Sequence, residues 1–149
     1  NHNYDADWQA LHELEIKNGI DGPRATRFGG PHPQSEPETK ALVDFCQKNN
    51  FEIATAFHSQ GEEIYWNYGP NTPKVSETIA NILALASGYT VSQPEGLAVG
   101  GGFKDWFIQK MKRPAFTIEL GKGENPLPAS SLEQIYNKIE KSLLISAVM

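Results

Sequence analysis

The sequence predicts an α/β fold in which helices cover both faces of a β-sheet. Two short apolar stretches, 51–61 and 115–121, have the composition of buried strands. In the first, Ile53, Thr55 and Phe57 alternate with two alanines, so the second face is also small and apolar, as in a strand covered on both sides. Helical patterns lie between and around these strands, and this alternation is typical of α/β folds.

Two helices are expected before the first strand. The first covers 8–17, and the Asn18-Gly19 pair is suited to end it. A loop rich in Gly, Pro and Arg follows, after which Ser35 is suited to cap a second helix with Pro37 in its first turn. The expected inner faces are Trp8, Leu11, Leu14 and Ile16 in the first helix and Ala41, Leu42, Phe45 and Cys46 in the second.

The second half continues the alternation. Residues 62–66 are suited to a short strand or a turn, 73–87 to a strong helix, 89–99 to irregular chain and 103–110 to a short helix. Ser130 or Ser131 is suited to cap a final amphipathic helix. The residues expected to face inward are Val75, Ile79, Ile82, Leu83 and Ala86 in the strong helix and Ile135, Ile139, Leu143 and Leu144 in the final one.

Composition restricts the function classes. The 149 residues suffice for one domain, and the net charge of -5 argues against a nucleic-acid or acidic-membrane partner. The single cysteine, Cys46, excludes an intramolecular disulfide, which is compatible with cytoplasm and with bacterial export. We find no signal peptide and no apolar run long enough to span a bilayer. Because the first residue is not methionine, we expect a processed chain or an excised piece, so the location stays open.

Two polar side chains stand where buried strands are expected to end. His58 closes the first strand before a glycine-containing turn, and Glu119 closes the second before Gly121. In open α/β sheets, ligands and catalytic groups gather at the carboxyl ends of strands. A histidine that ligates a metal and a carboxylate that handles the proton of an attacking water suit a metal-assisted hydrolase. The alternative is that His58 is a capping or hydrogen-bonding residue.

Two further features have open interpretations. The aromatic residues Tyr65, Trp66 and Tyr68 are suited either to loop packing or to the wall of a substrate cleft. His12 and Glu15 have the His-x-x-Glu spacing of zinc enzymes and share a helix face, but the pattern is short and common, so an ordinary charged helix face is favoured. The Gly100-Gly101-Gly102 segment lacks the spacing of a phosphate loop.

Several motifs in register resemble the zinc carboxypeptidase superfamily. They are the Asn1–Tyr4 opening, Phe57–Gly61, Gly101–Trp106 and Phe116–Gly121. The stretches 35–39 and 123–128 are most similar to the bacterial branch that cleaves peptidoglycan peptides, the γ-D-glutamyl-L-diamino acid peptidases. The resemblance covers the whole chain and implies a mixed sheet with helices on both faces.

The resemblance also implies a zinc site to which this chain contributes one part. In the family, zinc is held by a His-x-x-Glu pair and a later histidine, and His58 matches the later one. The pair belongs upstream of the Asn1–Tyr4 segment, whereas His12 and Glu15 lie after it. We therefore expect residues 1–149 to be the C-terminal part of a single zinc peptidase catalytic domain, inactive in isolation. Glu119 matches the general base, which takes a proton from zinc-bound water.

Substrate contacts are implied at Asn1, His2 and Lys104. His2 stands at the position of a family arginine that binds a terminal carboxylate. Leu97 aligns near the position of a family tyrosine that closes over the substrate. Histidine gives at most one charged contact, so both changes disfavour a carboxypeptidase that requires a free C-terminus. Lys104 matches the base of the side-chain pocket, where an ammonium suits the carboxylate of meso-diaminopimelate; the alternative is a solvated helix lysine.

The leading hypothesis is a zinc peptidase that hydrolyses the γ-D-glutamyl–meso-diaminopimelate bond of muropeptides. The resemblance implies a bacterial protein that is secreted or associated with the cell wall, and a cytoplasmic location is the alternative. The alternatives are a general metallocarboxypeptidase and a non-catalytic muropeptide-binding module. Retention of both His58 and Glu119 disfavours the last, because a binding module does not need a base. We also expect exposed sheet edges and apolar surface, hence self-association or pairing with a missing N-terminal part.

Overall fold

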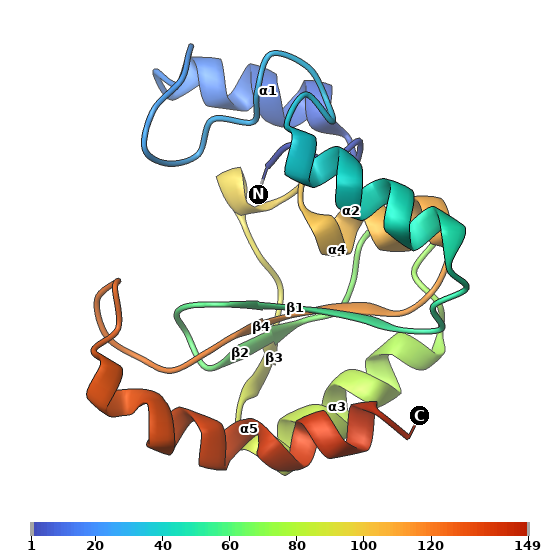
Figure 1. Ribbon diagram of the computed structural model, residues 1–149, viewed down its shortest axis with the longest axis vertical. Helices are drawn as coiled ribbons and strands as arrows, with labels where there is room; N and C mark the ends of the chain where they lie inside the picture. Colours follow the sequence, from blue (N-terminus) through green and yellow to red (C-terminus); the bar gives the residue numbers. More distant parts are fainter. Residues whose placement is uncertain (1, 149) are drawn as a thin grey trace.

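A four-stranded mixed sheet forms the centre of the computed structural model, which describes residues 2–148. Its strands are β1 (Ala54–His58), β2 (Glu63–Tyr65), β3 (Thr90–Ser92) and β4 (Ala115–Glu119), in the order β1-β4-β2-β3. β4 runs parallel to β1 and antiparallel to β2, and β2 runs parallel to β3. The carboxyl ends of β1 and β4 therefore meet at one end of the sheet, on the left in Figure 1.

Helices cover both faces of this sheet, which confirms the predicted fold class (Figure 1). On one face lie α1 (Trp8–Lys17), α2 (Pro37–Lys48) and α4 (Phe103–Trp106), which continues as the π-helical turn η2 (Phe107–Met111). On the other lie α3 (Val75–Ser87) and α5 (Leu132–Ser146). The short 3-10 turns are η1 (Gly96–Ala98) and η3 (Ala129–Ser131). None of the helices in residues 2–148 is long and apolar enough to cross a membrane.

The alternation of side chains along β4 sorts the interior into two clusters. Phe116 and Ile118 point to the α3/α5 layer, where they join a core that includes Ile79, Leu83 and Ile139. Ala115, on the opposite face, joins a second core. Its other buried residues are Tyr4, Ala6, Val43, Cys46, Trp106, Phe107 and Ile108. Because the period is two, Thr117 and Glu119 share the face of Ala115.

Side chains alternate along β1 in the same way, and its two alanines lie on the face that also carries Thr117 and Glu119 of β4. Thr55 and Phe57 face the α3/α5 layer, where they line a small gap beside Leu83 and Ile139. The small side chains of Ala54 and Ala56 occupy the other face. The prediction of a strand fully covered on both sides is wrong in part: β1 is an edge strand, and 43% of Phe57 is exposed.

α2 begins and packs differently from the prediction. Its N-cap is Glu36, not Ser35, and the Asn3 side-chain oxygen accepts a hydrogen bond from the Glu36 backbone N–H at 3.0 Å. A residue distant in sequence therefore satisfies a backbone donor at the helix start. The buried face of the helix consists of Thr39, Val43 and Cys46, whereas Leu42 and Phe45 are 38% and 54% exposed.

Other boundaries also differ from expectation. The segment expected to be irregular at 89–99 contains β3, which forms because β2 offers it a parallel partner. Ser131 stands at the N-cap of α5, but its hydroxyl donates to the Pro128 carbonyl at 2.7 Å and caps no helix N–H. Leu144 and Ile16 were expected to face inward and are 65% and 50% exposed. Helical spacing predicts that these residues share a face with core residues, but the neighbouring layer covers only part of that face.

Candidate active site

His58 and Glu119 lie side by side at the carboxyl ends of two neighbouring parallel strands. They are register partners in the β1–β4 ladder, and Nδ1 of His58 is 3.9 Å from Oε1 of Glu119. The Leu120 N–H donates to the His58 carbonyl at 2.8 Å, so the ladder continues past both residues. The side chains are 30% and 15% exposed, which leaves them accessible from a cavity but mostly shielded from water.

The loops that follow the two strands are tied together just beyond the pair. The Gly61 N–H donates to the Gly121 carbonyl at 2.8 Å, and the Asn125 side-chain amide donates to the Ser59 carbonyl at 2.8 Å. Gly121 has a φ of +67°, and a Cβ there would stand 2.8 Å from Ile135 of α5. Glycine is therefore favoured at this turn, because another residue would be strained there. One backbone and one side-chain hydrogen bond therefore hold the two loops together beyond the strand ends.

Burial sets the protonation behaviour of both groups. Burial raises the pKa of the Glu119 carboxyl, and the nearby carboxylate of Glu63 raises it further. Burial also lowers the pKa of His58, which favours the neutral imidazole that ligates metals. A carboxyl group whose pKa moves toward neutrality can both take and return a proton, which is the property a general base requires when it must later act as an acid.

A small cavity of about 90 Å³ opens beside this pair. Its lining includes His2, His58, Tyr65, Lys104 and Glu119, so four of the predicted site residues, Lys104 among them, meet in one place. A wider cavity of about 560 Å³ also shares His2, His58 and Glu119, and the loop 24–28 forms its other side. The predicted residue Asn1 lies outside the residues that the structure describes.

Lys104 is buried at this cavity and is not a solvated helix residue. Its side chain forms an ion pair with Asp105, and its ammonium donates to the Asn67 carbonyl at 2.9 Å. It also lies over the Tyr68 ring at 5.4 Å from the centroid. Asp105 accepts a further hydrogen bond from the Gly100 N–H at 2.8 Å. The lining of the cavity therefore includes a cation and an anion that are paired with each other, with little net charge.

The aromatic cluster has two fates. Tyr65 lines the cavity beside Glu119, and its hydroxyl donates to Glu63 at 2.6 Å. Trp66 packs against the core between the sheet and α3. The Tyr68 ring lies under Lys104, and its hydroxyl donates to Asp7 at 2.5 Å. Packing therefore accounts for Trp66 and Tyr68, whereas the role of Tyr65 as a wall of a substrate cleft stays a prediction. Leu97 lies in η1, whose neighbouring residue Ala98 lines the cavity.

Sequence reasoning missed Glu63 and Asp105. Glu63 stands opposite Glu119 in the antiparallel β2–β4 ladder, a register that only the folded sheet defines. Asp105 had a signal in the sequence, because an acidic residue directly follows a lysine expected near the cavity.

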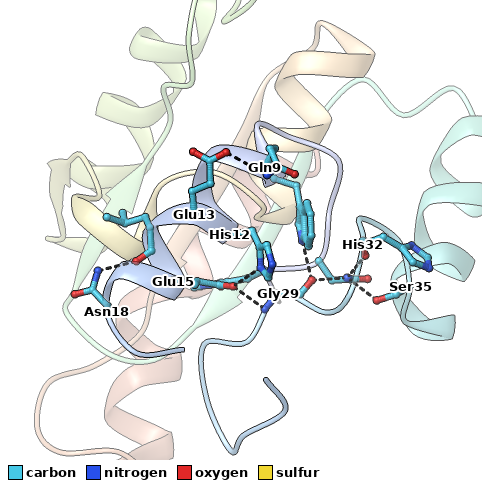
Figure 2. Close-up of polar contacts among 12 residues, drawn as sticks. Gln9, His12, Glu13, Glu15, Asn18, Gly29, His32 and Ser35 are labelled. Carbon is cyan, nitrogen blue, oxygen red and sulfur yellow. Dashed lines mark hydrogen bonds and ion pairs between the residues drawn. The ribbon is translucent and has the colours of Figure 1, made fainter. Parts of the chain in front are cut away.

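The His-x-x-Glu pair of α1 holds no complete metal site. Glu15 is fully buried, and its Oε2 atom lies 3.6 Å from Nδ1 of His12, while the His12 ring stacks on Trp8 at 4.6 Å between centroids. Figure 2 shows His12 and Glu15 turned toward each other beside Gly29. Across residues 2–148, no three His, Cys, Asp or Glu side chains stand together in a group that could hold a metal ion. Of the candidates, His58 fits one position in a zinc site.

Comparisons with known proteins agree with this geometry. Residues 1–142 match the family described as zinc carboxypeptidase. The chain is 38% identical over 93% of its length to the γ-D-glutamyl-L-diamino acid endopeptidase 1 of Lysinibacillus sphaericus, and it covers 33% of that protein. It is 35% identical over 86% of its length to the uncharacterized protein YqgT of Bacillus subtilis, of which it covers 34%. The chain thus spans about a third of the length of these curated relatives.

Solved structures share the fold. Carboxypeptidase A from Helicoverpa armigera superimposes with a TM-score of 0.66 at 21% identity, over 80% of this chain and 35% of that one. Thrombin-activatable fibrinolysis inhibitor gives a TM-score of 0.65 at 23% identity, over 99% of this chain and 39% of that one. These structures show the shared fold, and the family match over residues 1–142 establishes that the chain belongs to the zinc carboxypeptidase family.

Proposed function

We propose that this chain is the C-terminal part of a zinc peptidase catalytic domain that hydrolyses the γ-D-glutamyl–meso-diaminopimelate bond of peptidoglycan peptides. The observation that carries the proposal is the pairing of His58 and Glu119 at the ends of β1 and β4, 3.9 Å apart and facing one cavity. The substrate assignment rests on the 38% identity to an endopeptidase whose name specifies that bond. The share of the relatives that the chain spans supports its description as part of a domain.

In this proposal His58 is the residue that would hold zinc, and Glu119 handles protons. A bound zinc ion would supply Lewis acidity to the attacking water and the scissile carbonyl. Glu119 accepts a proton from the water while the oxygen of that water bonds to the carbonyl carbon. When the carbon–nitrogen bond breaks, Glu119 gives that proton to the leaving amine, so its carboxylate is regenerated. The raised pKa of Glu119 assists the second transfer.

The first test is Glu119→Gln in the complete protein that carries this chain. We expect kcat on a muropeptide to fall by about 10²- to 10⁴-fold, the usual range for general acid–base catalysis, with zinc content unchanged. Zinc is measured by elemental analysis and turnover by release of the diaminopimelate-containing product. The matched control is Glu52→Gln, because Glu52 precedes β1 at the opposite end of the sheet and its side chain is 77% exposed. Full activity of Glu119→Gln would refute the assignment.

The base of the cavity favours a zwitterionic substrate group. The side chain of meso-diaminopimelate ends in an amine and a carboxylate, and the Lys104–Asp105 pair offers one charge to each. His2 cannot form the bidentate contact that an arginine forms with a terminal carboxylate. This favours a peptidase of the γ-D-glutamyl–meso-diaminopimelate bond over a general metallocarboxypeptidase. A non-catalytic muropeptide-binding module is disfavoured because Glu119 is retained beside His58.

Lys104→Ala tests this substrate choice. We expect the ratio of kcat/KM for a diaminopimelate peptide to that for the matching lysine peptide to fall about tenfold, because the lysine peptide lacks the carboxylate. Loss of Lys104 leaves Asp105 buried without its cation, which lowers the stability of the protein. Because this loss affects activity on both substrates alike, the ratio is the right measure. Lys110→Ala, which removes a surface ion pair with Asp5, is the control. An unchanged ratio would contradict the role of Lys104.

A further inference from the structure

Glu15 is a buried carboxylate that the proposed chemistry does not use. It lies on α1, and its side chain is 0% exposed. Its Oε1 atom is 3.3 Å from Nδ1 of His2, and its Oε2 atom accepts the Gly29 N–H at 3.2 Å. His12 lies beside it, with Nδ1 3.6 Å from Oε2. In Figure 2, Glu15 points from α1 toward Gly29, with His12 on the same side.

A carboxylate in this position is costly, so its contacts indicate what it does. Asp and Glu are almost never fully buried unless paired, because the charge must be removed from water. Here the partners are a backbone amide and imidazole rings. The Gly29 carbonyl in turn accepts hydrogen bonds from the Asn3 amide at 2.6 Å and the Trp8 indole at 2.8 Å. Glu15 therefore links α1 to the segment that carries His2.

The backbone of His2 is held as tightly as its side chain. A Cβ on Gly101 would stand 2.6 Å from the His2 carbonyl oxygen, and a Cβ on Gly29 would stand 2.9 Å from it. Gly101 also has a φ of +64°, so two close approaches of glycine backbone enclose this residue. With the backbone enclosed, the bond to Glu15 determines how the ring is turned. His2 lines both cavities that contain His58 and Glu119.

We propose that Glu15 is a positioning residue that holds His2 as the tautomer protonated at Nδ1, so that Nε2 accepts a hydrogen bond from an N–H group of the bound peptide. The inference rests on the proposed function for the identity of the peptide. A carboxylate that accepts from one ring nitrogen fixes the tautomer and leaves the lone pair on the other. Burial lowers the pKa of His2, although the hydrogen bond that its ring donates to Glu15 works against this, so the neutral ring is the form present near pH 7.

This role differs from that of an arginine at the same position. An arginine carries only donors and binds a carboxylate, whereas neutral His2 held by Glu15 presents an acceptor. An acceptor suits a peptide that continues through the site, because each further residue brings a backbone N–H. The His-x-x-Glu spacing of α1 then has a function without a metal: Glu15 orients His2, and His12 stacks on Trp8 beside it.

The first test reads the tautomer directly in the 149-residue chain labelled with ¹⁵N-histidine. At neutral pH we expect the His2 ring, assigned from a His2→Asn spectrum, to show a protonated Nδ1 and an unprotonated Nε2. Glu15→Leu removes the acceptor and should give the Nε2-protonated tautomer that free imidazole side chains favour. Glu13→Leu is the matched control, because Glu13 lies on the same helix, is exposed and accepts a hydrogen bond from Gln9 at 3.1 Å.

If Glu15→Leu does not fold, Glu15→Gln decides the question. Its amide oxygen retains an acceptor while the charge is lost, so we expect the Nδ1-protonated tautomer to persist and the titration midpoint of His2 to fall, since the Glu15 charge raises the pKa of His2. A wild-type His2 protonated at Nε2, or a His2 tautomer and midpoint that neither variant alters, would overturn the proposal. These spectra need no activity, so they decide it even if the proposed peptidase function fails.

The second test separates positioning from a general structural role in the complete protein. Glu15→Leu and His2→Ala should each raise KM for the muropeptide about tenfold with kcat within about twofold, as expected for a contact made equally in ground and transition states. The double variant should be no worse than either single one, because both remove the same contact. Additive losses, or a fall in kcat without a change in KM, would contradict the mechanism.

Discussion

Glu119 illustrates how two neighbours tune one carboxyl group. Burial raises its pKa, and Glu63 raises it further because the two residues are register partners across β2 and β4. The native state therefore binds its proton more tightly than the unfolded chain does. By linkage, the contribution of Glu119 to stability is present at low pH and is lost as the pH rises above 4.5 through the native pKa.

Glu63→Gln should consequently lower the pKa of Glu119. The substitution removes the like charge and leaves burial as the remaining cause of the shift. Carbon-detected NMR titration of the labelled glutamate carboxyls measures this, with Glu119→Gln used to assign the resonance. Glu77→Gln, an exposed position in the first turn of α3, serves as the control. An identical Glu119 midpoint in Glu63→Gln and wild type would show that the two carboxylates do not interact.

At the scale of the element, α3 shows which part of an apolar face contributes to stability. The sequence predicted Val75, Ile79, Ile82, Leu83 and Ala86 on the inner face. Ile79 and Leu83 are 8% and 1% exposed, but Val75 and Ile82 are 51% and 39% exposed. The sheet and α5 cover a narrow stripe of the helix, so residues at the margin of a broad apolar face remain in water.

Leu83→Ala should lower the free energy of unfolding by about 2–5 kcal/mol, because it leaves a cavity beneath the sheet. Leu85→Ala, two residues along the same helix and 89% exposed, should change it by less than about 0.5 kcal/mol. Urea unfolding with the slope held common to all variants measures both values. Equal losses in the two variants would mean that α3 does not pack on the sheet as described.

At the scale of the whole molecule, one side of the sheet remains open. β1 is an edge strand, and exposed apolar side chains lie near it on both layers, namely Leu42, Phe45 and Phe57. Tyr4, Phe51 and Phe107 line an apolar cavity of about 400 Å³ between α2 and this edge. An unpaired edge beside apolar surface is a template for association.

The self-association expected from the sequence therefore stays a prediction, and its partner here is a second copy of the chain. Sedimentation velocity over a range of concentrations should show a monomer–dimer equilibrium. Phe45→Asp should shift this equilibrium toward monomer, while Leu85→Asp, also at an exposed position but on α3, should leave it unchanged. A chain that stays monomeric at every concentration would show the prediction to be wrong.

The sequence by itself determined the fold class, the presence of the two apolar strands and the placement of His58 and Glu119 at their ends. These features depend on local periodicity and on residues that stop a strand, and both are present in a short stretch of chain. The zinc carboxypeptidase motifs likewise lie in short contiguous segments, so the family could be identified before the fold was known.

Tertiary structure alone decided the contacts that join distant segments. Asn3 rather than Ser35 satisfies the start of α2, Glu63 faces Glu119, and Glu15 holds His2 across thirteen positions of sequence. None of these pairings leaves a periodic signal, because sheet register and loop packing are set by the complete set of layers. The burial of Lys104 belongs to the same class, since its partner Asp105 is adjacent in sequence but the surfaces that exclude water come from elsewhere in the chain.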